Sequence, residues 1–250
     1  ITCDEKLIHE ERLIICTHSM FVAYDYFDTI ILYDLHLIGE ENFSDYEALI
    51  STMNLIGCTN RFVGFSSCIA DPRSLGNWIH CDPKFIFAFT PDMRKIRFKI
   101  QTFNFPTSRS RLMAMSRPLF SSIKDSKTSI VFVANVQQMY NTAFELINFA
   151  SIIGNNKLFS RGYETPKFRD ETLNQVSEYG IALIHPSLYD YDKELIFNNF
   201  GSTIGCIIVV IECIWELNIS ADVVVMKGTD SYDGYIHNHV EYPISLTMEA

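Results

Sequence analysis

This sequence of 250 residues has no cysteines at the short spacing that is typical of metal sites. Its seven cysteines include no CxxC pair, whereas zinc sites usually combine ligands at short spacing. An odd number of cysteines also cannot close completely into disulfides. Both absences argue against a metal site or a disulfide framework, and they favour buried free thiols in a reducing compartment.

The chain also lacks a net positive charge. The chain has 20 Lys and Arg against 30 Asp and Glu, which gives a formal net charge of −10. Nucleic-acid binders that act alone are usually basic, because phosphate contacts supply most of their affinity. The acidic balance therefore argues against strong autonomous RNA binding, although it leaves room for a local basic groove.

Long apolar runs and several catalytic signatures are absent as well. The longest apolar run, residues 204–211, is far shorter than the roughly 20 residues that span a bilayer, so we expect no membrane partner. The chain contains no GxSxG and no GxGxxG after a strand. An unrelated α/β metabolic enzyme would need such a pocket, so that interpretation has no motif to support it.

What the sequence does contain is an alternation of β-rich apolar runs and helical patterns. The predicted strands are residues 13–17, 29–34, 61–66, 85–89, 95–101, 129–134, 181–185, 206–211 and 222–226. The predicted helices are a capped one from Ser44 to Gly57, then 72–79, 108–122 with an interruption at Pro118, 137–151, one starting near Pro166, and 189–200. Strands separated by helices indicate βαβ units, so we predict an α/β fold of two domains with mainly parallel sheets flanked by helices.

Ordered motifs run through both predicted domains. Residues 30–39 read IILYDLHLIG, and residues 61–71 read RFVGFSSCIAD. The first half continues with WIHC at 78–81 and PDMR at 91–94. The second half carries RLMAM at 111–115, SIVFVA at 129–134, a lone His185, WELN at 215–218, KGT at 227–229, YDGYIH at 232–237 and VEYPI at 240–244.

In this order the pieces resemble the motifs of tandem-cassette superfamily-two RNA helicases, and the match covers nearly the whole chain. The second helicase motif, the DEVH box, matches Tyr33, Asp34, Leu35 and His36. The third matches Ser66 and Ser67, and the fifth matches Trp215, Glu216, Leu217 and Asn218. The family's RNA contacts match Thr17 and His185. Four of these residues also have an ordinary interpretation: a core aromatic for Tyr33, a turn for Ser66 and Ser67, and a satisfied polar residue for His185.

The resemblance implies two RecA-like domains, residues 1–105 and 106–250. The first would be incomplete at its N-terminus, and the second would stop before the sixth motif. The nearest branch within the family is the C-terminal, degenerate cassette of the spliceosomal U5 snRNP helicases. The activating-signal-cointegrator and ribosome-quality-control helicases share this architecture, and KGT at 227–229 resembles them equally well.

The chain departs from the family pattern where ATP hydrolysis is carried out. It has no GxxxxGK[ST] phosphate loop, which the family carries upstream of the first strand here. Tyr33 stands where the family has the Asp that holds Mg²⁺, and Asp34 stands at the position of its Glu. A phenol is a poor Mg²⁺ ligand at neutral pH. A shifted register would make Asp34 the ligand, but without its Glu partner. Glu216 replaces a glycine of the fifth motif.

Two functional hypotheses follow from the resemblance. The first is a catalytically degenerate pseudo-helicase that serves as a protein-interaction and regulatory platform within a nuclear pre-mRNA splicing helicase. Its partners would be an active sister cassette and spliceosomal proteins, with RNA bound through the parent protein. The second is an active ATP-dependent RNA helicase of the activating-signal-cointegrator type. ATP and Mg²⁺ would act in the intact parent, and we expect no cofactor or resident metal for this fragment.

Overall fold

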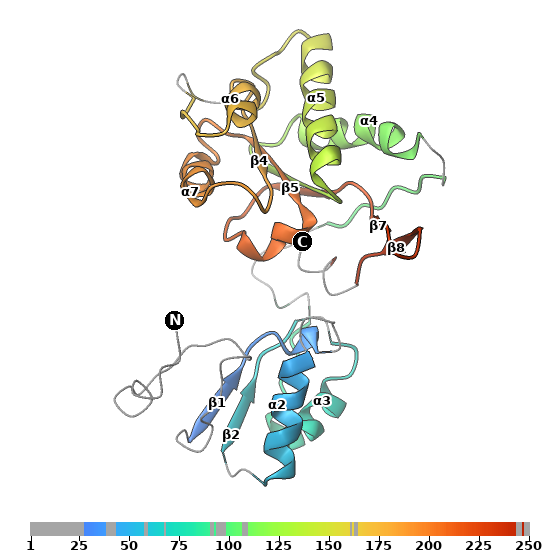
Figure 1. The fold of residues 1–250 in the computed structure, drawn as a ribbon, viewed down its shortest axis with the longest axis vertical. Helices are drawn as coiled ribbons and strands as arrows, with labels where there is room; N and C mark the ends of the chain where they lie inside the picture. Colours follow the sequence, from blue (N-terminus) through green and yellow to red (C-terminus); the bar gives the residue numbers. More distant parts are fainter. Residues whose placement is uncertain are drawn as a thin grey trace. The chain divides into compact units, whose positions relative to one another are not determined.

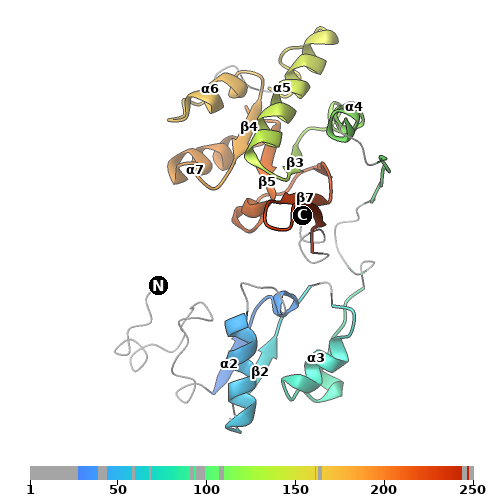
Figure 2. The same cartoon turned by 45° about the vertical axis from the view of Figure 1, so that its right-hand side comes forward.

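The chain divides into two compact units, Ile1–Ile100 and Gln101–Ala250, and each is described by itself (Figures 1 and 2). The computed structural model describes residues 28–38, 44–57, 60–67, 69–90, 93, 99–106, 110–160, 162, 165–243 and 247. The predicted strand 13–17, with Thr17, lies outside the described residues, and so does most of the predicted strand 95–101. No helix among the described residues combines the length and the apolar character needed to cross a membrane.

The first unit is built on two parallel strands, β1 (Thr29–Leu32) and β2 (Arg61–Gly64). Three further elements accompany α2 (Ser44–Leu55): the 3-10 turns η3 (Leu35–Leu37) and η5 (Pro83–Phe85), and α3 (Pro72–Trp78). The side chains of Ile30, Leu32, Ile50 and Met53 are buried together in a small core. The apolar positions of α2 recur at helical spacing, which is why one face of this helix covers one face of the sheet.

Local signals in the sequence set the ends of these helices. The Asp71 carboxylate accepts hydrogen bonds from the backbone N–H groups of Arg73 (3.0 Å) and Ser74 (3.2 Å), so it caps α3. Pro72 occupies the first turn, where no donor is lost. Beyond the end of α2, Gly57 adopts a left-handed conformation at φ 66°.

The second unit has a four-stranded parallel sheet in the order β4-β5-β3-β6. Its strands are β3 (Ser129–Val133), β4 (Ile181–Ile184), β5 (Cys206–Val210) and β6 (Val223–Met226). Its helices are α4 (Arg111–Ile123), α5 (Val136–Ile152), α6 (Glu171–Ser177), α7 (Asp190–Asn199) and the 3-10 segment η7 (Ile211–Glu216). Parallel crossovers are right-handed, so α5 and α6, between β3 and β4, cover one face, and α7, between β4 and β5, covers the other.

Every residue of β3, β4 and β5 is buried, as expected for parallel strands with helices on both faces. These strands were predicted within one residue of their observed ends. After β6 the chain forms an antiparallel hairpin of β7 (Asp230–Asp233) and β8 (Asn238–Glu241), which the sequence reasoning missed (Figure 1). The α/β prediction with mainly parallel sheets flanked by helices is confirmed, and the architecture is consistent with a RecA-like fold.

Three local predictions were wrong. Residues 85–89 are not a strand, because their alternating Phe85, Phe87 and Phe89 are exposed instead of packed on a sheet. Pro118 does not interrupt α4, because buried residues on both sides of it, among them Ser116 and Leu119, keep the helix packed on the core.

The third error concerns the start of α6, which lies at Glu171 rather than near Pro166. The Asp170 carboxylate accepts a hydrogen bond from the backbone N–H of Leu173 (2.7 Å) and therefore caps the helix there. The preceding loop is held in a non-helical conformation, because Asn174 bonds to the backbone of Phe168 through both its amide nitrogen and its amide oxygen (2.8 Å each).

Candidate functional site

The candidate site in the first unit lies where β1 and β2 both end. The two strands are parallel, so the residues that follow them meet at one edge of the sheet. The backbone N–H of Phe65 donates to the carbonyl of Leu32 (2.8 Å), and the N–H of Leu35 donates to the carbonyl of Phe65 (3.0 Å). These bonds bring the matched second and third motifs side by side, although the two are about thirty residues apart in the sequence.

His36 and Ser67 connect the two motifs through side-chain atoms. The backbone N–H of Ser67 lies 3.4 Å from His36 Nδ1, and its hydroxyl oxygen lies 3.3 Å from the same nitrogen. The N–H can only donate, so Nδ1 accepts in this arrangement. The neighbouring Ser66 is directed elsewhere, since its hydroxyl donates to the carbonyl of Ser67 (3.1 Å).

Tyr33 is not a core aromatic: its side chain is 69% exposed. Its ring lies 6.1 Å from that of Phe65, at an interplanar angle of 44°. Asp34 adopts a left-handed backbone conformation (φ 56°, ψ 44°) and begins η3, a geometry that Asp tolerates better than most residues. An aromatic pair therefore lies at the edge of the sheet, and one of its members, Tyr33, is the residue matched to the family's Mg²⁺ carboxylate.

Tyr46, on α2, fixes the backbone of this edge and was missed by the sequence reasoning. Its hydroxyl donates to the carbonyl of Tyr33 (2.9 Å). Burial, and secondarily the negative charge of Asp34, raises the pKa of Tyr46 to about 12, so the donor stays protonated at neutral pH. In the sequence, Tyr46 lies two residues after the start of α2 and showed only the helical spacing of a residue that faces the core.

Tyr33, at the position matched to the family's Mg²⁺ carboxylate, does not fit a Mg²⁺–ATP centre. Mg²⁺ in such enzymes needs a hard oxygen ligand, usually a carboxylate, in addition to the phosphates. Here the matched position carries a phenol whose ring lies 6.1 Å from that of Phe65, and the carboxylate of Asp34 follows one residue later. Within the described ranges there is no group of three or more His, Cys, Asp or Glu side chains that could hold a metal.

In the second unit, the matched residues also follow parallel strands. His185 comes directly after β4, and burial lowers its pKa, opposed by the nearby Asp170 and assisted by Lys193. Trp215 and Glu216 belong to η7, which follows β5. Leu217 and Asn218 continue from it, with Leu217 packed against the core and Asn218 exposed.

Lys193, on α7, links these matched residues and was also missed. Its ammonium group donates to the Glu216 carboxylate at 2.7 Å, and this bond raises the pKa of Lys193. The added carboxylate of Glu216 is therefore neutralised by α7. An ion pair thus forms at the position matched to a glycine of the family's fifth motif.

A second ion pair holds the end of β6. Lys227 is 5% exposed, and its ammonium group donates to Glu145 (2.8 Å) and to the hydroxyl of Thr142 (3.0 Å), both on α5. The same Glu145 carboxylate accepts a hydrogen bond from Ser116 on α4. The ammonium group of Lys227 is paired with Glu145 in this network. It therefore contributes no unpaired positive charge to the edge where His185 lies.

The fold and the site together define an α/β protein with parallel sheets whose candidate functional residues follow the strand ends, as in RecA-like nucleotide-dependent proteins. No family model matches the chain. The chain is 28% identical over 236 residues to "Activating signal cointegrator 1 complex subunit 3" of Homo sapiens, covering 88% of this chain and 11% of the relative. It is 26% identical over 236 residues to "DExH-box ATP-dependent RNA helicase DExH14" of Arabidopsis thaliana, with the same two coverages.

A third relative, "Pre-mRNA-splicing factor brr2" of Schizosaccharomyces pombe, is 29% identical over 269 residues, covering 98% of this chain and 12% of the relative. The chain is thus a homologue of Brr2-like superfamily-two helicases. It spans only about a tenth of the length of the relatives quoted above.

Proposed function

We propose that this chain is a catalytically degenerate helicase cassette that serves as a protein-interaction and regulatory platform. The observation that carries the proposal is the exposed Tyr33–Phe65 pair at the edge of the sheet where a working cassette needs its Mg²⁺ carboxylate. The contact between His36 and Ser67 supports a cassette that keeps its motif architecture without this ligand. The second motif, Tyr33, Asp34, Leu35 and His36, then has a structural role.

The proposed domain limits are those of two RecA-like domains, residues 1–105 and 106–250. The proposed parent works in pre-mRNA splicing in the nucleus, with an active sister cassette and spliceosomal proteins as partners and RNA bound through the parent. The similarity to a pre-mRNA-splicing factor over nearly the whole chain supports this context. RNA contacts by Thr17 and His185 belong to the same proposal.

The alternative is an active ATP-dependent RNA helicase cassette of the activating-signal-cointegrator type. The relatives of that name, and the ATP-dependent RNA helicase from Arabidopsis thaliana, cover 88% of the chain and favour this alternative. It requires Asp34 to provide the Mg²⁺ ligand from its left-handed position.

The deciding experiment measures Mg²⁺-dependent ATP hydrolysis and fluorescent-ATP binding on the chain extended upstream through the parent's phosphate loop. We expect no hydrolysis above background. The double variant Tyr33→Asp/Asp34→Glu, which rebuilds the family's carboxylate pair, should gain Mg²⁺-dependent nucleotide binding. Tyr33→Phe is the matched control and should change nothing. Hydrolysis that is abolished by Asp34→Asn in the otherwise unaltered cassette would overturn the proposal in favour of the alternative.

A further inference from the structure

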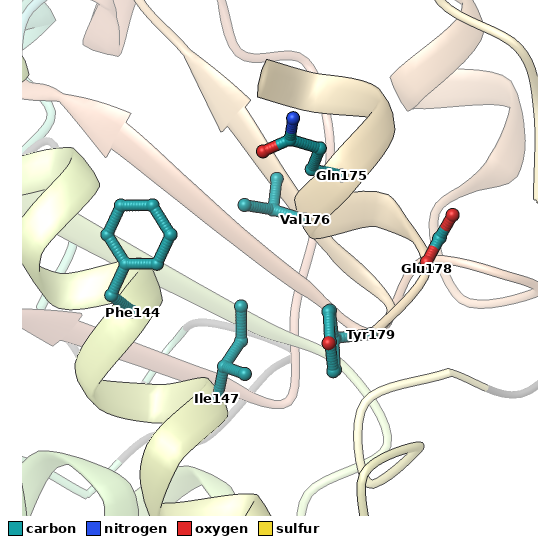
Figure 3. A pocket seen from close by; sticks show the side chains of 6 residues that line it. All are labelled: Phe144, Ile147, Gln175, Val176, Glu178 and Tyr179. Carbon is teal, nitrogen blue, oxygen red and sulfur yellow. The ribbon is translucent and has the colours of Figure 1, made fainter. Parts of the chain in front are cut away.

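A groove between α5 and α6 is separate from every residue matched to a helicase motif. It is a hollow of about 300 Å³ lined by Phe144, Ile147, Gln175, Val176, Glu178 and Tyr179. Figure 3 shows the two α5 side chains on one side and those of α6 and its following turn on the other, with Glu178 at the end farthest from Phe144. A second hollow of about 390 Å³ shares Glu178 and Tyr179 and continues toward Lys157.

The floor of the groove is apolar and partly open to solvent. Phe144 is 50% exposed on α5, whereas Leu146 on the same helix is fully buried in the core. Val176 is 1% exposed, so the floor is anchored in the folded core and is not a loose surface loop. An apolar floor with a half-exposed aromatic and a charged residue at its rim has the composition of a protein interface, which combines aromatic anchors with a polar rim.

Of the residues that line the first hollow, Glu178 alone is charged, whereas Lys157 lines the second hollow. Neither α5 nor α6 contains a Lys or Arg residue. The single charged residue of α5, Glu145, is already paired with Lys227. The exposed carboxylate of Glu178 thus sets the charge at the rim of the first hollow. A phosphate backbone would be repelled there, whereas a basic side chain would be attracted.

The groove also lies away from the candidate site in the sheet. Glu178 and Tyr179 come just before Gly180 and β4, and His185 comes immediately after β4. The two positions therefore lie beyond opposite ends of a strand that is about 13 Å long at its usual rise. An occupant of the groove would leave the carboxyl ends of the strands open.

We infer that this groove docks a segment of a partner protein that places apolar side chains on Phe144 and Ile147 and a Lys or Arg against Glu178. The inference rests on the proposed function, because it names the kind of partner that the platform takes. The segment is amphipathic, since one row of side chains enters the groove while the other faces water.

The test is a selection of random 12-residue peptides displayed on phage against the full 250-residue chain, with counter-selection on Phe144→Ser. Both substitutions used here, Phe144→Ser and Glu178→Lys, alter exposed side chains, and the thermal unfolding of each variant is checked first. We expect enriched peptides that combine apolar residues with Lys or Arg. Their affinity, measured by fluorescence anisotropy, should fall about tenfold in Phe144→Ser, as for the loss of an anchor residue.

Reversing the charge of Glu178 tests whether basic peptide residues contact it. Glu178→Lys should weaken the selected basic peptides and strengthen versions in which Lys and Arg are replaced by Glu. Glu194→Lys makes the same charge change on the exposed surface of α7 and should leave binding unaltered. The inference is overturned by peptides insensitive to both groove variants, by enrichment of acidic peptides, by the absence of any enriched peptide, or by single-stranded RNA binding that depends on the same two residues.

The two proposals can fail separately. Hydrolysis of ATP by the extended cassette would overturn the proposed function and leave the peptide selection unchanged. Peptides whose affinity is unchanged by the groove variants would overturn the inference that the groove is a docking site. The ATPase result would stand, because a protein-interaction platform can use another face.

Discussion

In the second unit every residue of β3, β4 and β5 is buried, whereas no residue of β2 in the first unit is fully buried. Both units build parallel sheets, but only the second has helices on both faces of the strands that the structure describes. In the first unit Ile30 and Leu32 of β1 face the core, while Ile31, between them, is 59% exposed. The burial of a parallel strand thus depends on the helices that cover its sheet, and not on the strand pattern alone.

This difference has a consequence for the candidate site. A residue at the edge of the half-covered sheet can change its chemistry without disturbing a core. Tyr33 is 69% exposed, so the aromatic ring in place of a carboxylate needs no repacking of neighbours. In the second unit, by contrast, the negative charge of Glu216, the residue matched to a family glycine, is balanced by an ion pair with Lys193.

The strongest test of the comparison is a matched pair of substitutions in the two sheets. Ile208→Ala in β5 removes a fully buried side chain and should lower the free energy of unfolding by about 2–5 kcal/mol. Ile31→Ala in β1 should lower it by no more than about 0.5 kcal/mol, because that side chain is mostly exposed. Urea titrations of both variants check this, and equal effects would mean that Ile31 is covered in solution.

A second prediction concerns ion pairs in the two units. Lys227→Met leaves Glu145 without its partner and should lower the free energy of unfolding by about 2 kcal/mol, less than for a fully buried pair because Glu145 is partly exposed. The exposed pair of Lys84 and Asp82 in the first unit provides the control, and Lys84→Met should have almost no effect. The double variant Lys227→Met/Glu145→Leu should recover part of the loss. A double variant no more stable than Lys227→Met would show that the loss is one of packing and not of charge.

A third prediction concerns the hydroxyl of Tyr46. Tyr46→Phe keeps the buried ring but removes the hydrogen bond to the carbonyl of Tyr33, and should lower the free energy of unfolding by about 0.5–1 kcal/mol. Tyr232→Phe, on the exposed hairpin of the second unit, should have no measurable effect. Hydrogen exchange should show faster exchange of the backbone N–H groups of Leu35 and Phe65 in Tyr46→Phe. Unchanged exchange there would argue that Tyr46 does not hold this edge.

The smallest predicted effect is a pH dependence from His185. Burial lowers its pKa in the folded state, so the unfolded chain takes up the proton first as the pH falls below the ordinary value of about 6.5. The contribution of this residue to stability is therefore present above about pH 6.5 and is lost as the pH falls below it. His185→Gln should have a shallower decline in stability between pH 7.5 and 5.5 than the unaltered chain. A parallel decline in both proteins would contradict the assignment.

Much of the fold could be predicted because its strands are short, apolar and bounded by polar residues. Strands β3, β4, β5 and β6, and helices α3, α5 and α7, were predicted within about a residue of their observed ends. The errors arose where tertiary contacts decided the outcome: α4 continues through Pro118 because its other residues are packed, and α6 starts late because Asp170 caps it. The assignments of the site residues to helicase roles remain predictions.

The sequence by itself determined the alternation of strands and helices, because hydrophobic periodicity is a local property of the chain. It also determined the order of the motif-like pieces, from which the match of Tyr33 to the family's Mg²⁺ carboxylate is predicted. Only the tertiary structure decided that Tyr33 is exposed against Phe65, that Tyr46 holds its carbonyl, and that Lys193 and Lys227 are committed to ion pairs. These contacts join residues far apart in the chain, and no local pattern specifies which distant partner a side chain will meet.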